Sequence, residues 1–107
     1  MTHIIVNIGR NVGDTPLEES NWNSFVNSVI YAIENTTAMK DGMPPRAMVF
    51  RGTGSWDGIW EDTASVQLWD VAEVDGNDLT RRLRLLADTY GQDAIALTIG
   101  GTTLIEP

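Results

Sequence analysis

The sequence contains no cysteine, and histidine and lysine occur only once each. Without cysteine, the chain can form no disulfide bond, no thiolate nucleophile and no zinc site made of thiolates. The single histidine, His3, lies at the start of the chain, and the sequence places no triad or metal-site partners beside it. We therefore expect no catalytic residues, no bound metal and no cofactor.

Basic residues are also scarce, with seven against fifteen acidic ones and a net charge of −8. This charge repels a phosphate backbone, so we expect no binding to nucleic acid. No apolar run approaches the roughly 20 residues that cross a bilayer, so we expect no membrane partner. The apolar start of the chain, residues 3–8, lacks a basic leader. The expected location is the cytoplasm, or the host cytoplasm if the protein is viral.

The 107 residues, 42% of them hydrophobic and 21% charged, predict a single globular domain over residues 1–107. A β-branched run over residues 3–8 predicts a first strand. Thr15, Pro16 and Glu18 have the spacing of a capping box with proline at the first helical position, which predicts a helix start. An apolar stripe with spacings of three and four follows; it consists of Trp22, Phe25, Val26, Val29, Ile30 and Ile33.

The second half of the chain continues with predicted strands at 46–51 and 64–72 and a second helix that opens at Asp75. A strand at 94–99 comes next, and Gly100-Gly101 predicts a tight hairpin into residues 102–105. The resulting order is β-α-β-β-α-β. The predicted fold class is thus α+β, a ferredoxin-like sandwich with an antiparallel sheet, two helices on one face and a C-terminal hairpin.

The glycine-rich stretch FRGTGSWDG, residues 50–58, has the spacing G-x-G-x-x-x-G and precedes a strand. A dinucleotide loop needs G-x-G-x-x-G before a helix, whose N-terminus holds the phosphates. Glycines in strands more often mark a bulge, and Asp57-Gly58 is a turn signal. We interpret the stretch as a bent hairpin. The carboxylate pairs Glu61/Asp62 and Asp75/Asp78 could bind a hard cation, but solvated turn acids are the default interpretation.

An ordered series of short motifs resembles a family of small bacterial and phage proteins classed as a domain of unknown function. The motifs are Ile8-Gly9-Arg10, Trp22-x-x-Phe25, Gly52-x-Gly54-x-Trp56 and Tyr90-Gly91. The resemblance spans most of the chain and supports the fold. It departs from the family in lacking an obvious export signal, and it implies no activity, because the family has no established one.

Two groups of residues are candidates for binding. Arg10, Arg51, Trp56 and Trp60 are the candidates for contact with a ligand or partner, since arginine and tryptophan are enriched in interfaces. Strand alternation places Ile5, Trp69 and Val71 on the sheet face away from the helices, which is more apolar than a solvated face should be. We therefore expect self-association through this face, as a homodimer.

Three functions remain open from the sequence. The first is a small acidic, non-enzymatic binding or interaction protein that self-associates through its sheet. The second is a small-molecule-binding enzyme of the dimeric α+β barrel kind, with a cleft between sheet and helices lined by Arg10, Arg51, Trp56 and Trp60. The third is a phage-encoded inhibitor of a host protein. No acid–base pair or nucleophile is evident, which favours the first.

Overall fold

A computed structural model describes residues 2–107 of the chain. The elements in chain order are β1 (Thr2–Gly9), β2 (Asn11–Val12), β3 (Thr15–Pro16), α1 (Glu19–Glu34), β4 (Thr37–Met39), β5 (Met48–Trp56), β6 (Ile59–Val74), α2 (Gly76–Thr89) and β7 (Ala96–Gly101). Neither helix in this part of the chain is long and apolar enough to cross a lipid bilayer.

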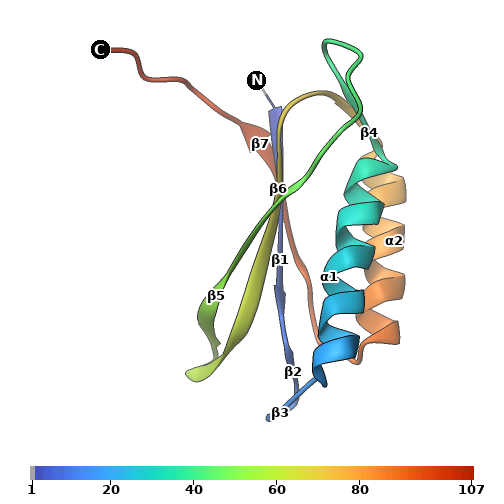
Figure 1. Ribbon diagram of the computed structural model, residues 1–107, viewed down its shortest axis with the longest axis vertical. Helices are drawn as coiled ribbons and strands as arrows, with labels where there is room; N and C mark the ends of the chain where they lie inside the picture. Colours follow the sequence, from blue (N-terminus) through green and yellow to red (C-terminus); the bar gives the residue numbers. More distant parts are fainter. Residues whose placement is uncertain (1) are drawn as a thin grey trace.

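The main sheet has the order β4-β6-β1-β7, and β5 also pairs with β6. All of these pairings are antiparallel. Both helices lie on one side of the sheet (Figure 1). Two helices on one face of an antiparallel sheet confirm the predicted ferredoxin-like α+β class.

The core fills the space between the helices and the sheet. Its buried residues include Trp22, Phe25, Val29 and Ile33 from α1, Leu79 and Leu83 from α2, Ile4, Val6 and Ile8 from β1, and Val66 and Leu68 from β6. The Phe25 ring stacks on the Tyr90 ring with centroids 4.7 Å apart, which ties α1 to the end of α2. The apolar stripe predicted for the first helix is confirmed as its buried face.

The start of the first helix differs from the prediction. Thr15 and Pro16 form β3, in which they pair with Val12 and Asn11, so the chain is still extended where a capping box was expected. Helix α1 starts four residues after Thr15, with Glu18 at its N-cap and no side-chain capping bond. The small β2–β3 hairpin, which the sequence analysis did not anticipate, uses the residues that would otherwise have capped the helix.

The glycine-rich stretch lies in β5 and in the turn that joins it to β6, as predicted. Trp56 pairs with Ile59 across a two-residue turn formed by Asp57 and Gly58. Both turn residues have positive φ, 50° and 80° respectively, as a type I′ turn requires. Because no helix follows, this stretch offers no helix N-terminus to a phosphate group.

A bulge in β6 corrects the face predicted for Val71. The pairing with β1 shifts register between Thr2, which pairs with Val71, and Ile4, which pairs with Leu68. Asp70 adopts a φ of 56°, and this extra residue turns Val71 toward the helices, where it is 2% exposed. Trp69 precedes the bulge and stays on the other face, 38% exposed.

The predicted C-terminal hairpin is absent, since β7 ends at Gly101 and residues 102–107 form no strand. Gly100 and Gly101 pair with His3 and Thr2 of β1 and so extend the strand instead of turning it. A hydrogen bond between the Thr102 hydroxyl and Nδ1 of His3 continues this contact. Beyond it, the chain runs out on the side of the sheet away from the helices (Figure 1).

Candidate functional site

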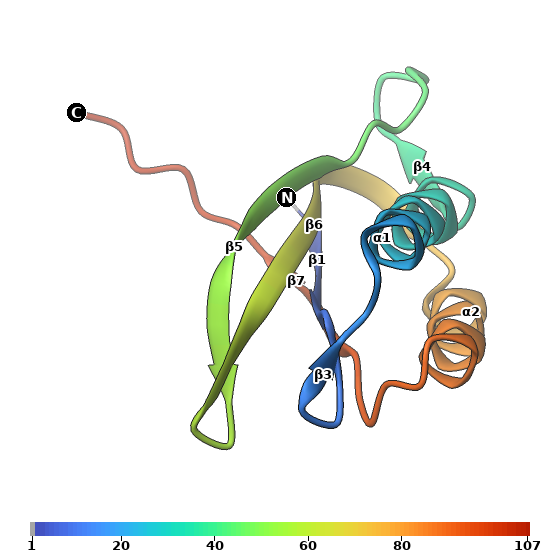
Figure 2. The ribbon, with the colours of Figure 1, turned by 60° about the horizontal axis from the view of Figure 1, so that its bottom comes forward.

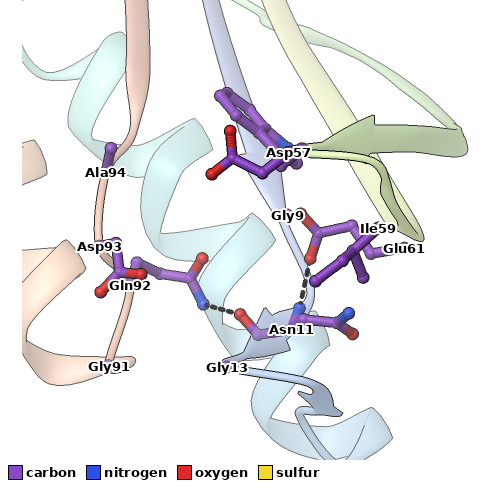
Figure 3. A pocket seen from close by; sticks show the side chains of 11 residues that line it. Gly9, Asn11, Gly13, Asp57, Ile59, Glu61, Gly91, Gln92, Asp93 and Ala94 are labelled. Atoms are coloured by element: carbon purple, nitrogen blue, oxygen red, sulfur yellow. Dashed lines mark hydrogen bonds between the residues drawn. The ribbon is translucent and has the colours of Figure 1, made fainter.

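The lower end of the sheet brings three separate segments together. The β5–β6 hairpin, the β2–β3 turn and the connection between α2 and β7 all lie at this end (Figures 1 and 2). They enclose a pocket of about 370 Å³. The lining residues are Gly9, Asn11, Gly13, Trp56, Asp57, Ile59, Glu61, Gly91, Gln92, Asp93 and Ala94 (Figure 3).

Glu61 is held at the floor of this pocket. Its Oε2 accepts a hydrogen bond of 2.7 Å from the backbone N–H of Asn11. The side chain can lie there only because residue 9 is glycine: a Cβ at Gly9 would lie 2.2 Å from Oε1 of Glu61. Strand β1 thus ends in a glycine that makes room for a carboxylate 52 positions later in the chain.

Gln92 forms the opposite wall and is also fixed in place. Its side-chain amide nitrogen donates to the backbone carbonyls of Asn11 and Tyr90, each at 3.3 Å. Gly91, at a φ of 65°, turns the chain after α2 so that Gln92 and Asp93 reach the pocket. The predicted role of Gly91 as the residue that ends the second helix agrees with this conformation.

The lining is acidic and partly aromatic. It contains three carboxylates, of Asp57, Glu61 and Asp93, and the indole of Trp56, which is 45% exposed. None of the lining residues, all in the described part of the chain, is lysine or arginine. Such a lining favours a small organic cation by its charge, and an exposed indole adds a surface on which a cation can pack. It repels phosphate groups for the same reason.

The four predicted ligand-contact residues are dispersed. Trp56 lines the pocket, and together with Arg51 it also lines a second hollow of about 380 Å³ beside β5. Arg10 is used in structure: its Nε donates to the Leu17 carbonyl at 2.8 Å and its guanidinium pairs with Asp62 at 3.1 Å. Trp60 is 71% exposed and lines neither hollow.

Core side chains fill the centre of the space between sheet and helices, and a hollow at its edge, between α2 and β7, is lined by none of the four predicted residues. In each of the two acidic pairs, the two carboxylates have different partners. Glu61 faces Asn11 and Asp62 faces Arg10, as successive strand residues must. Asp75 caps α2 by accepting from the Asp78 N–H at 3.0 Å. Within residues 2–107, no three histidine or acidic side chains are grouped to hold a metal ion.

The pKa of the Asp78 carboxyl is lowered by its neighbours. Hydrogen bonds from Arg81, and secondarily from Arg82, lower the pKa of its carboxyl below the ordinary value of 3.8. The ion-pair distances are 2.5 Å and 3.1 Å. These contacts lie in the first two turns of α2, so their role is to stabilise the start of that helix.

The residues that the sequence analysis missed at this site are Asn11, Glu61, Gln92 and Asp93. Glu61 was considered only as half of an acidic pair. The relevant signal was a glycine at the end of the first strand, but the sequence does not show which side chain occupies the space above it. That information comes from the pairing of β1 with β6.

Comparisons with known proteins show a similarity in fold and assign the chain to no family. No family model matches it, and no curated protein matches it in sequence. Two solved structures of a phage SAM lyase are similar to it. The apo structure has 17% identity and a TM-score of 0.55 and covers 92% of this chain and 78% of the lyase chain. The complex with S-methyl-5′-thioadenosine has 18% identity, a TM-score of 0.52 and coverages of 92% and 79%.

These neighbours are structures of an enzyme, and they add no support to the non-enzymatic role expected from the sequence. At this level of identity the similarity extends to the fold alone.

Proposed function

We propose that the chain binds S-adenosylmethionine, or a closely related adenosyl sulfonium compound, in the pocket at the lower end of the sheet. The observation that carries the proposal is the acidic lining around Trp56 and Glu61, with no basic residue among the lining residues described. The fold shared with a phage SAM lyase, one of whose solved structures holds S-methyl-5′-thioadenosine, points to this ligand among small organic cations. The cytoplasmic location expected from the composition is part of the proposal.

The ligand and the pocket have matching chemistry. S-adenosylmethionine carries a positive sulfonium centre and a flat adenine ring. A carboxylate about 4–5 Å from a unit positive charge contributes between about 1 kcal/mol in water and about 4 kcal/mol near a protein surface. The indole of Trp56 can stack on the adenine or face the sulfonium, at about 0.5–2 kcal/mol. Glu61 and Gln92 are held by hydrogen bonds to Asn11, so the pocket needs little ordering before it binds.

Calorimetric titration with three adenosine compounds tests the proposal. S-adenosylmethionine should bind. S-adenosylhomocysteine, which has the same adenosyl group but a neutral sulfur, should bind at least about tenfold more weakly, a difference of about 1.4 kcal/mol. ATP, with its phosphates, should not bind at millimolar concentration. Absence of binding by S-adenosylmethionine, or equal affinity for the neutral compound, would contradict the proposal.

A matched pair of variants locates the binding. Glu61→Gln removes the carboxylate charge from the pocket and should raise the Kd by about tenfold. Asp62→Asn changes the adjacent residue, whose carboxylate pairs with Arg10 and is outside the lining, and should leave the Kd near that of the wild type. Equal effects of the two substitutions would place the ligand elsewhere.

The second candidate is catalysis on the same ligand, and the observation that favours it is the fold of the lyase neighbours. Cleavage of the bond between sulfur and the terminal carbon of the methionine chain leaves the bonding electron pair on sulfur and gives S-methyl-5′-thioadenosine, while the released carbon chain closes on its own carboxylate as a lactone. Incubation with S-adenosylmethionine followed by liquid chromatography should then show S-methyl-5′-thioadenosine accumulating beyond the amount of protein. Binding without product would make the chain a non-enzymatic binding protein, the first of the functions expected from the sequence.

A further inference from the structure

The side of the sheet opposite the helices carries large apolar side chains that remain partly exposed. We call this side the open face, and it includes the apolar residues Ile5, Met48, Phe50 and Trp69. Met48 pairs with Gln67 and Phe50 with Ser65, so these side chains lie opposite to the buried Val66 and Leu68. Phe50 is 54% and Met48 44% exposed. An antiparallel sheet with one solvated face normally places polar residues there.

A second uncovered apolar surface lies on the exit segment, residues 102–107. Leu104 is 66% exposed and Ile105 89% exposed. The sequence Thr-Thr-Leu-Ile is rich in residues that favour strands, yet the segment pairs with no strand. Its base is fixed by the contact of Thr102 with His3, and the His3 ring in turn stacks on Trp69 with centroids 4.9 Å apart.

The open face and the exit segment lie on the same side of the molecule. Both views show the segment leaving β7 and running out away from the helices, into the space in front of the open face (Figures 1 and 2). A single partner placed against the open face would therefore also meet the segment. Every copy of the chain carries both surfaces. A second copy can therefore cover the open face of the first with its exit segment and have its own open face covered in return.

We propose that a second copy of this chain packs on the open face, with the exit segment of each copy lying on the open face of the other. The contacting side chains Met48, Phe50, Trp69, Leu104 and Ile105 are uncharged. Such a surface lets two chains of net charge −8 approach closely. The exposed parts of these five side chains amount to about 100 Å² each, on the order of 500 Å² per copy. A symmetric pair would thus bury about 1,000 Å², the area that a biological interface should reach and slightly less than the area typical of tight complexes.

Sedimentation equilibrium, from about 10 to 500 μM and without ligand, tests this assembly independently of the proposed binding activity. The wild type should associate. Phe50→Lys on the open face and the double substitution Leu104→Asp with Ile105→Asp on the segment should each give a folded monomer. Ile105 is so exposed that its replacement removes no core packing, which keeps this variant informative even if Phe50→Lys fails to fold.

Leu85 supplies the control, because it is 55% exposed, as Phe50 is, but lies on α2. Leu85→Lys makes the same charge change as Phe50→Lys, and Leu85→Asp adds one carboxylate on the helix side; both variants should associate like the wild type. A wild type that stays monomeric over the whole range would overturn the proposal and leave the face to a different protein. An assembly that survives the segment substitutions would overturn it equally, since the segment would then not be the occupant.

Discussion

Replacing Gly9 with alanine would place a methyl group where the Glu61 carboxylate now lies. The new Cβ would be 2.2 Å from Oε1, 2.5 Å from Cδ and 2.7 Å from Oε2 of Glu61. Real Cβ atoms do not approach other heavy atoms so closely, so one group must move. The end of a glutamate side chain is the most mobile part of this contact, and we expect it to rotate out of the pocket.

The expected loss of stability follows from the hydrogen bond that this rotation breaks. The Asn11 N–H donates to Glu61 Oε2 at 2.7 Å, and a bond to a charged acceptor contributes about 1.5–3 kcal/mol. Glu61 and Asn11 are half-buried, so water can replace part of this bond, and we expect a net loss of about 1 kcal/mol. For a domain of this size, that lowers the Tm by about 4–8 °C.

A double-mutant cycle assigns the effect to the contact between these two residues. With alanine at position 61 there is no carboxylate to displace, and Gly9 does not adopt a left-handed φ. Gly9→Ala should then be neutral or stabilise by up to about 1 kcal/mol, because alanine restricts the unfolded chain. The measurement is thermal unfolding by circular dichroism of the four proteins in the cycle. Equal destabilisation by Gly9→Ala in both backgrounds would refute this account of the pocket floor.

Two further predictions concern stability. Trp22 is 4% exposed in the core, and its replacement by alanine should lower the free energy of unfolding by about 3–5 kcal/mol. A typical domain has a free energy of unfolding of about 5–15 kcal/mol, so the variant should be much less stable. Thermal unfolding close to that of the wild type would contradict the position of Trp22 in the core. Arg81 and Arg82 lower the pKa of Asp78 in the folded protein below 3.8. The contribution of Asp78 to the free energy of unfolding is therefore complete above about pH 4 and is lost as the pH falls through the lowered pKa. Asp78→Asn should therefore flatten the dependence of stability on pH below pH 4, measured by urea unfolding, and an unchanged profile would exclude this role.

Local signals in the sequence were sufficient for much of the fold. The spacing of Trp22, Phe25 and Val29 predicted the buried face of α1, and Asp57-Gly58 predicted the turn between β5 and β6. These features depend on neighbours within a few residues, which a single sequence displays. The order of the four long strands and the two helices followed from them, and with it the ferredoxin-like class, while the short strands β2, β3 and β4 were not predicted.

Features that depend on pairing between distant residues could not be read in this way. The positive φ of Asp70 shifts β6 by one residue and sends Val71 into the core, although strict alternation places it outside. Gly100 and Gly101 look like a turn until β1 is seen to extend far enough to pair with them. The pocket depends in the same way on β1 ending where Glu61 of β6 can fold over Gly9.

The position of β1 between β6 and β7 also determines when this protein can fold. Residues 2–9 find their two sets of hydrogen-bonding partners only at residues 63–71 and 96–101. During synthesis, the first strand therefore has no partner strand until β6 has emerged, and its other edge stays unpaired until β7 follows. Contacts so distant in sequence slow folding and leave a nascent chain open to aggregation. Production at low temperature or with a chaperone should accordingly raise the yield of folded protein more than changes in the surface helices would.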